Sequence, residues 1–204
     1  YLGRLVAEHL ARDPAVESIL GMDVVEPAPL PPKASFGVAD VLRSDFERLL
    51  QGIDAVVHLA FIVAPPRTMP MAGIDAINVE GSRRVFEGAV AAGASRIVYA
   101  SSIAAYGAHP DNPQALTEDH PLRPNLGWYY SRNKGQVEAL LDGIEARNPE
   151  LIVIRMRPCV FLGPTINNPF GLLFDRRFLI SLMEYVRRRG EERPEGREKD
   201  GMRA

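Results

Sequence analysis

Residues 55–60, Ala-Val-Val-His-Leu-Ala, and residues 151–156, which begin Leu-Ile-Val-Ile, form two short and nearly continuous apolar runs. Runs of this kind are typical of parallel β-strands that are buried on both faces. Three more β-branched runs, at 18–24, 36–39 and 96–101, alternate with longer helical patterns. The alternation predicts right-handed βαβ units, and therefore an α/β fold in which a doubly wound parallel sheet lies between two layers of helices.

The helical patterns carry recognisable start and stop signals. Ser44 is expected to be an N-cap, with Glu47 three residues later completing a capping box. Gly93 is expected to end a helix as its C-cap. The four predicted helices cover residues 2–11, 44–51, 74–92 and 125–147.

The composition is that of a soluble globular protein. Hydrophobic residues make up 46% of the 204 residues, charged residues 25%, and the formal net charge is −2. This balance gives no attraction to nucleic acid or to a membrane surface, and no apolar run approaches the roughly 20 residues that span a bilayer. Cys159 is the only cysteine, so no internal disulfide can form, which fits a reducing, cytoplasmic compartment. The four His are too scattered to predict a metal site.

The most specific chemical signal is Tyr130-Ser131-Arg132-Asn133-Lys134, a Tyr-x-x-x-Lys pattern within a predicted helix. Four residues are about one helical turn, so the phenol and the ammonium share a face. A free tyrosine has a pKa near 10, and a neighbouring cation lowers it by favouring the phenolate. The pattern therefore predicts an acid-base pair, although tyrosine and lysine also fall four residues apart by chance in ordinary helices.

Two further residues strengthen this interpretation. Ser102 follows the predicted strand 96–101 and precedes Tyr130 by 28 residues, so its hydroxyl could bind a substrate oxygen while Tyr130 moves the proton. Asp23 ends the first predicted strand, 20 residues after Gly3, where dinucleotide-binding folds place an acid that binds the adenosine ribose. A carboxylate there repels the 2′-phosphate of NADP, and no adjacent Arg compensates, so NAD is favoured over NADP.

Together, several segments resemble the extended short-chain dehydrogenase/reductases, the NAD-dependent epimerase/dehydratase family. The resemblance covers residues 1 to about 165 and implies a Rossmann-type sheet. Besides 130–134, the matching segments are Val57-His58-Leu59-Ala60, Asn78-Val79-Glu80-Gly81, Ala100-Ser-Ser-Ile-Ala-Ala-Tyr-Gly107 and Arg157-Pro-Cys-Val-Phe-Leu-Gly-Pro164.

The resemblance implies roles for individual residues. Ser102, Tyr130 and Lys134 would be catalytic, with Tyr130 and Lys134 also contacting the cofactor. Asn78 would help to order the active site. The other implied NAD-binding residues are Gly3, Asp23, Asp40, Val41, Leu59, Ala60, Pro158 and Val160. His58 lies in the middle of a predicted strand and is expected to be a satisfied core residue. Cys159 is expected to be a packing residue, since nothing in the sequence pairs with it.

The chain also departs from the family pattern. The family begins with a strand and a Gly-x-x-Gly-x-x-Gly loop, of which only the last glycine can be present, as Gly3. We therefore expect a fragment without its first strand. Residues 1–165 would form an incomplete NAD-binding domain, and 166–204 the start of a substrate domain followed by a disordered charged tail.

Three functions remain open at this stage. The first is an NAD-dependent oxidoreductase or epimerase acting on a nucleotide sugar, with a homodimer as one assembly open to the complete protein. Family dehydratases carry Asp-Glu after the catalytic hydroxyl residue, whereas Ile103-Ala104 follows Ser102, which argues against that form of water elimination. The second is an alcohol or ketone reductase acting on a steroid-like, aldehyde or lactone substrate. The third is a non-catalytic dinucleotide sensor, which the retained Ser, Tyr and Lys disfavour.

Overall fold

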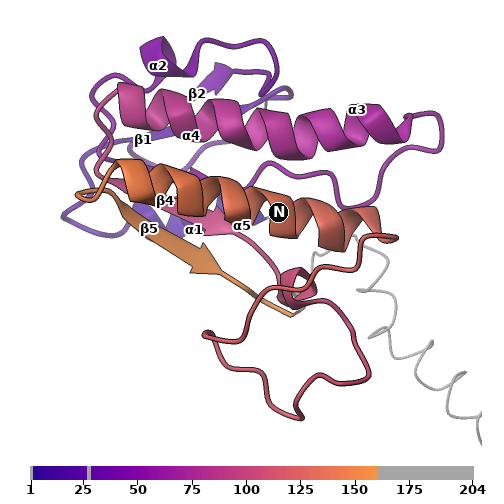
Figure 1. The fold of residues 1–204 in the computed structure, drawn as a ribbon. Helices are drawn as coiled ribbons and strands as arrows, with labels where there is room; N and C mark the ends of the chain where they lie inside the picture. The colour runs from indigo at the N-terminus through magenta and orange to yellow at the C-terminus, as the bar shows by residue number, and fades with distance from the viewer. Residues whose placement is uncertain (1, 27–28, 160–204) are drawn as a thin grey trace, which may run out of the picture. The chain divides into compact units, whose positions relative to one another are not determined.

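The computed structural model describes residues 2–26 and 29–159, whose strands are all parallel (Figure 1). Strand β1 (Ile19–Asp23) pairs with β2 (Ala34–Val38). Strands β3 (Ala55–His58), β4 (Arg96–Ala100) and β5 (Ile152–Met156) form a second sheet in the order β3-β4-β5. The predicted α/β class and the parallel strand pairing are confirmed.

The two sheets are not joined by a backbone ladder. Within the described ranges, no strand pairs with the free edge of β1 or of β3. In a doubly wound sheet of strand order 3-2-1-4-5-6, the first strand lies between the second and the fourth, which correspond here to β1 and β3. The observed order, β2-β1 and β3-β4-β5, therefore matches the expected one with a break at that position.

The helices differ from the predicted ones mainly at their ends. The run predicted at 74–92 is longer and contains one π-helical turn in its middle. Helix α5 begins at Tyr129 rather than Asn125, because the Asn125 side chain bonds the backbone of Ala108 instead. The observed helices are α1 (Leu2–Leu10), α2 (Phe46–Leu49), α3 (Met71–Asp75), the π-helix η1 (Ala76–Glu80), α4 (Gly81–Ala91), the 3₁₀-helix η2 (Ile103–Tyr106) and α5 (Tyr129–Arg147).

One predicted helix cap is wrong and another is confirmed. Asp45, not Ser44, caps α2, since its carboxylate accepts a hydrogen bond from the Arg48 amide. The Ser44 hydroxyl oxygen instead accepts a hydrogen bond from the backbone amide of Asp40, four residues earlier. Gly93 has a φ of 87°, and the Ala94 amide next to it bonds the Ala89 carbonyl, so this glycine closes α4 as expected.

The core lies between the second sheet and the helical pair α4 and α5, which run side by side (Figure 1). Helix α2 packs so closely on α4 that a Cβ at Gly88 would lie 2.5 Å from the Cβ of Phe46. No side chain other than hydrogen fits at that contact. The largest fully buried side chains of this core are Phe86, Ile97, Tyr99, Val137 and Leu141.

The expectation that β3 and β5 are buried on both faces is wrong for the described residues. Ile152, Ile154 and Met156 of β5 are 45–56% exposed, and Val57 of β3 is 37% exposed. Helices α4 and α5 pack on the alternate set of side chains, so the described helices cover one face of these strands.

Among the described residues, no helix is both long enough and apolar enough to cross a bilayer. The expected domain boundary at 165, the charged tail and Val160 lie outside the described residues.

Candidate active site

Lys134 lies on the buried face of α5, with only 3% of its surface exposed. Its ammonium donates a hydrogen bond of 2.6 Å to the carbonyl of Ala100, the last residue of β4. The same nitrogen lies 5.7 Å from the centre of the Tyr130 ring, one helical turn earlier. The predicted Tyr130 and Lys134 pair therefore shares a helix face, at the carboxyl end of the central strand of its sheet.

Aromatic rings surround the Lys134 ammonium. Its nitrogen lies 3.6 Å from the centre of the Phe61 ring and 4.8 Å from that of Tyr99. Burial lowers the pKa of Lys134 from 10.5 to about 7, and the negative charge of Glu138 opposes part of that shift. Ring faces and Glu138 thus favour the ammonium, while removal from water disfavours it.

Ser102 is nearly buried and caps η2, where its hydroxyl oxygen accepts a hydrogen bond from the Ala104 amide. The same short helix is tied to α5, because the Ser131 hydroxyl donates to the Ala104 carbonyl at 2.6 Å. Ser131 directly follows Tyr130. The segments that carry Ser102, Tyr130 and Lys134 are thus joined by direct hydrogen bonds.

Asn78 lies in the π-helical turn η1 and is completely buried. Its amide side chain bonds both backbone groups of Ile62, at 2.7 and 3.2 Å, and donates to the Asn133 side chain at 3.2 Å. Asn78 therefore fastens the segment after β3, which carries Phe61, to α5. Irregular π turns often occur at functional sites, because the widened turn redirects a side chain.

The residues expected to bind the adenosine part of a dinucleotide lie at or just beyond the carboxyl ends of β1 and β2. The exposed Asp23 ends β1, where its carboxylate accepts a hydrogen bond from the Val24 amide. The carbonyl of Asp23 accepts from the amide of Ala39, which directly precedes Asp40. Val41 packs against α4, since its Cγ2 lies 2.5 Å from where a Cβ of Gly81 would be.

Three more expected cofactor residues occupy nearby strand ends. Leu59 and Ala60 directly follow β3, and the Leu59 side chain lies 3.6 Å from where a Cβ of Gly3 would be, at the start of α1. Pro158 follows β5, and its carbonyl accepts a hydrogen bond of 3.2 Å from the amide of Ile103, next to Ser102.

His58 is a satisfied core residue, as expected. It is 4% exposed, and its Nε2 lies 2.9 Å from the Ser82 hydroxyl oxygen. Burial, aided by the charge of Lys134, lowers the pKa of His58 to about 3, so the ring is neutral at pH 7. Cys159, by contrast, is exposed, which does not fit the expectation that it packs in the interior.

Sequence patterns indicated neither Phe61 nor the ion pair between the buried Glu138 and the partly buried Arg157. Phe61 follows the family-like segment 57–60, but an aromatic residue in a loop carries no periodic signal. Glu138 is 1% exposed and receives two hydrogen bonds, of 2.8 and 2.7 Å, from the Arg157 guanidinium. Glu138 lies four residues after Lys134, and that spacing is the one signal that could have placed it on the same helix face.

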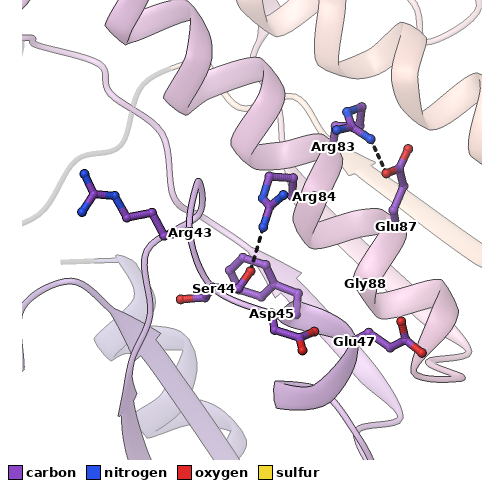
Figure 2. A pocket seen from close by; sticks show the side chains of 9 residues that line it. Arg43, Ser44, Asp45, Glu47, Arg83, Arg84, Glu87 and Gly88 are labelled. Atoms are coloured by element: carbon purple, nitrogen blue, oxygen red, sulfur yellow. Dashed lines mark hydrogen bonds and ion pairs between the residues drawn. The ribbon is translucent and has the colours of Figure 1, made fainter.

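A separate pocket of about 260 Å³ lies between α2 and α4, and none of the expected catalytic residues line it (Figure 2). Several of its charged groups are engaged with one another or with the backbone. Arg83 pairs with Glu87, and Arg84 donates to the Ser44 carbonyl at 3.0 Å. This pocket is therefore distinct from the candidate active site.

Comparison with known proteins places this arrangement in a family. The model of the NAD dependent epimerase/dehydratase family matches residues 1–195. UDP-glucose 4-epimerase 2 of Oryza sativa subsp. japonica is 34% identical over 137 residues, which are 65% of this chain and 32% of that protein. The dTDP-glucose 4,6-dehydratase of Streptomyces griseus is 31% identical over 110 residues, 53% of this chain and 33% of that protein. The chain thus spans about a third of the length of these relatives.

Solved structures agree with the fold. UDP-glucuronic acid 4-epimerase from Bacillus cereus, in complex with NAD, superposes with a TM-score of 0.67 over 82% of this chain and 56% of that chain, at 22% identity. A short-chain dehydrogenase/reductase superfamily protein from Agrobacterium tumefaciens with bound NAD gives a TM-score of 0.54 over 68% of this chain and 40% of that chain, at 30% identity. On the family match and this Rossmann-type architecture, the chain belongs to the NAD-dependent epimerase/dehydratase family.

Proposed function

We propose that the protein is an NAD-dependent oxidoreductase or epimerase acting on a nucleotide sugar, with Ser102, Tyr130 and Lys134 as its proton-transfer groups. The observation that carries the proposal is the Lys134 ammonium, buried beneath aromatic rings and one helical turn from Tyr130. A cation in that position stabilises negative charge that develops on the Tyr130 oxygen, so the phenol can serve as the acid-base group.

The residues fit NAD by the chemistry of their donors and acceptors. The exposed Asp23 carboxylate at the end of β1 suits the two ribose hydroxyls and repels a 2′-phosphate. The Lys134 ammonium has three N–H donors and spends one on Ala100, which leaves donors for a second ribose. NAD, when bound, supplies the hydride acceptor.

The chain's own groups account for the proton movements. Tyr130 accepts the proton of the substrate hydroxyl as a phenolate and later returns it as a phenol. The Ser102 hydroxyl donates a hydrogen bond to the same substrate oxygen as its charge develops. The Lys134 ammonium stabilises the negative charge of the Tyr130 phenolate in both steps. A cytoplasmic location and a homodimer are further parts of this proposal.

Substitution of Tyr130 by Phe tests the proposal, in protein expressed from its complete gene. Tyr130→Phe removes the proton carrier and keeps the ring, so we expect turnover of UDP-glucose to fall by about 10²–10⁴-fold while NAD binding stays within a few-fold. Tyr129→Phe is the matched control, because the neighbouring phenol donates to the Val63 carbonyl instead. Near-normal turnover by the Tyr130 variant would reassign the acid-base role.

A reductase of apolar alcohols or ketones is the second candidate. Trp128, whose ring centre lies 5.4 Å from that of Tyr130, and Ile103, next to Ser102, are each 47% exposed. Large apolar surfaces beside both hydroxyl groups suit a substrate without a sugar. A higher kcat/KM for cyclohexanol than for UDP-glucose would favour this candidate. Tight NAD binding without turnover of either substrate would favour the sensor instead.

A further inference from the structure

Glu138 lies at the centre of a buried network that joins three elements. Its carboxylate receives two hydrogen bonds from the Arg157 guanidinium, just beyond β5, and one from the Ser101 hydroxyl, just beyond β4. Glu138 is on α5, and both it and Ser101 are at most 3% exposed. The network therefore sets how the ends of β4 and β5 meet the helix that carries Tyr130 and Lys134.

The network extends to the backbone at Ser102. Arg157 also donates to the Tyr106 hydroxyl at 2.8 Å, and Tyr106 is the last residue of the short helix that Ser102 caps. The carbonyl of Pro158, next to Arg157, accepts from the Ile103 amide at 3.2 Å. The residues on both sides of Ser102 are thus held by contacts that depend on Glu138 or Arg157.

Glu138 also faces cationic side chains from two elements, and one of these cations is Lys134. From β5, the Arg155 guanidinium approaches Glu138 at 3.5 Å, and it pairs more closely with Asp142 and Glu145 of α5. From α5, Lys134 lies one helical turn before Glu138, and the carboxylate raises the pKa of that ammonium against the effect of burial. Glu138 thus has a mechanical link to Ser102 and an electrostatic link to Lys134.

We propose that Glu138 is a positioning residue, which aligns the Ser102 hydroxyl through Ser101 and Arg157 and places a carboxylate one helical turn from the Lys134 ammonium. This inference rests on the proposed function, since it takes Ser102 and Lys134 as reacting groups. An ordinary structural ion pair would hold the elements together equally well if it were replaced by apolar side chains of similar size.

The test replaces the whole network by apolar groups, in protein expressed from its complete gene. Removing one partner of a buried pair leaves an unpaired charge, whereas replacing all partners often preserves stability. We expect the triple variant Ser101→Ala, Glu138→Leu, Arg157→Met to melt within a few degrees of the unchanged protein and to bind NAD normally. Its kcat for UDP-glucose should be about 10- to 100-fold lower, on the scale of a small misplacement of a reacting group. Unchanged kcat in a folded triple variant would overturn the proposal.

A second measurement needs neither substrate nor cofactor. An NMR titration of the Lys134 side-chain nitrogen should show a lower midpoint in Glu138→Gln than in the unchanged protein. Glu150→Gln is the control, because it removes an exposed negative charge just beyond α5, outside the contacts that Glu138 makes, and its midpoint should not move. An unchanged midpoint in Glu138→Gln would also overturn the proposal.

The remaining outcomes are distinguishable. If the triple variant does not fold, the test uses Ser101→Ala and Glu138→Gln, which keep most of the contacts. A kcat for UDP-glucose that is about 10- to 100-fold lower in these variants would support the positioning role, and an unchanged kcat would overturn it. Tyr130→Phe is measured in parallel. A large loss in Tyr130→Phe together with unchanged kcat in the network variants would reject the positioning role and leave the proposed function standing.

Discussion

The Lys134 ammonium lies 3.6 Å above the centre of the Phe61 ring, although the two residues are 73 positions apart in the sequence. The contact depends on the segment after β3, which Asn78 binds through the backbone of Ile62. A desolvated cation over a ring face gains about 2 kcal/mol or more. Asn78, Phe61 and Lys134 therefore act as one unit, in which a distant amide sets the environment of the ammonium.

Substitution of Asn78 by Ala should disturb this unit. The change leaves the buried amide and carbonyl of Ile62 without their side-chain partner, and such losses cost about 1–3 kcal/mol each. We expect a lower urea midpoint and a lower pKa for Lys134 as Phe61 moves away. Asn148→Ala is the control, since its side chain bonds the Ile144 carbonyl near the end of α5. Equal effects of the two substitutions on the Lys134 titration would contradict the link.

Cofactor choice should depend on Asp23. Its removal eliminates a carboxylate that accepts from ribose hydroxyls and repels a 2′-phosphate. In Asp23→Ala, the Kd for NAD should rise and the Kd for NADP should fall relative to it, as measured by titration calorimetry. Glu17→Ala, at the opposite end of β1, should leave the ratio of the two constants unchanged. If the ratio of the Kd values for NAD and NADP is also unchanged in Asp23→Ala, Asp23 does not bind the adenosine ribose.

His58 should make the protein sensitive to acid. Its pKa is about 3 in the folded protein and near 6.5 in the unfolded chain, so the unfolded state binds more protons between these values. The free energy of unfolding therefore falls as pH decreases through this window, by up to about 1.4 kcal/mol per pH unit.

Urea unfolding at pH 7, 5.5 and 4.5 measures this effect. His58→Gln removes the titrating ring, so the variant should lose less stability on acidification than the unchanged protein. His9→Gln, which changes an exposed histidine, should keep the original slope. An identical slope in His58→Gln would show that the ring does not resist protonation.

The free edges of β1 and β3 should limit the stability of residues 1–204 expressed by themselves. Unpaired buried backbone groups cost about 1–3 kcal/mol each, and total stability is usually only about 5–15 kcal/mol. We expect a weakly cooperative melt and little or no NAD binding. A cooperative transition that moves to higher temperature with added NAD would contradict this.

The sequence predicted those features that depend on neighbours along the chain. The five strands, the Gly93 cap and the shared face of Tyr130 and Lys134 all follow from local periodicity, and the structure bears them out. Ser44 failed as a cap because two adjacent residues, Ser44 and Asp45, could both serve, and a contact with the Asp40 amide decided between them.

Features that depend on distant partners could not be predicted in this way. The Glu138 and Arg157 pair joins a helix to a strand end, and a glutamate at a helical position otherwise indicates a solvated face. The π turn at Asn78 lies inside an unbroken helical pattern, so nothing local marks it. The exposed side of β5 depends on which helices cover the sheet, which its own apolar residues do not reveal.

The burial of Lys134 and Glu138 has a consequence for the response to salt. Both side chains are at most 3% exposed, so mobile ions cannot enter between them, whereas the partly exposed pairs of Arg83 with Glu80 and Glu87 are open to the electrolyte. At physiological ionic strength the interaction of exposed charges is screened with a characteristic length of about 8 Å, and buried charges are screened far less. Added salt should therefore weaken the surface pairs while the protonation equilibrium of Lys134 stays nearly the same in dilute buffer and in concentrated salt.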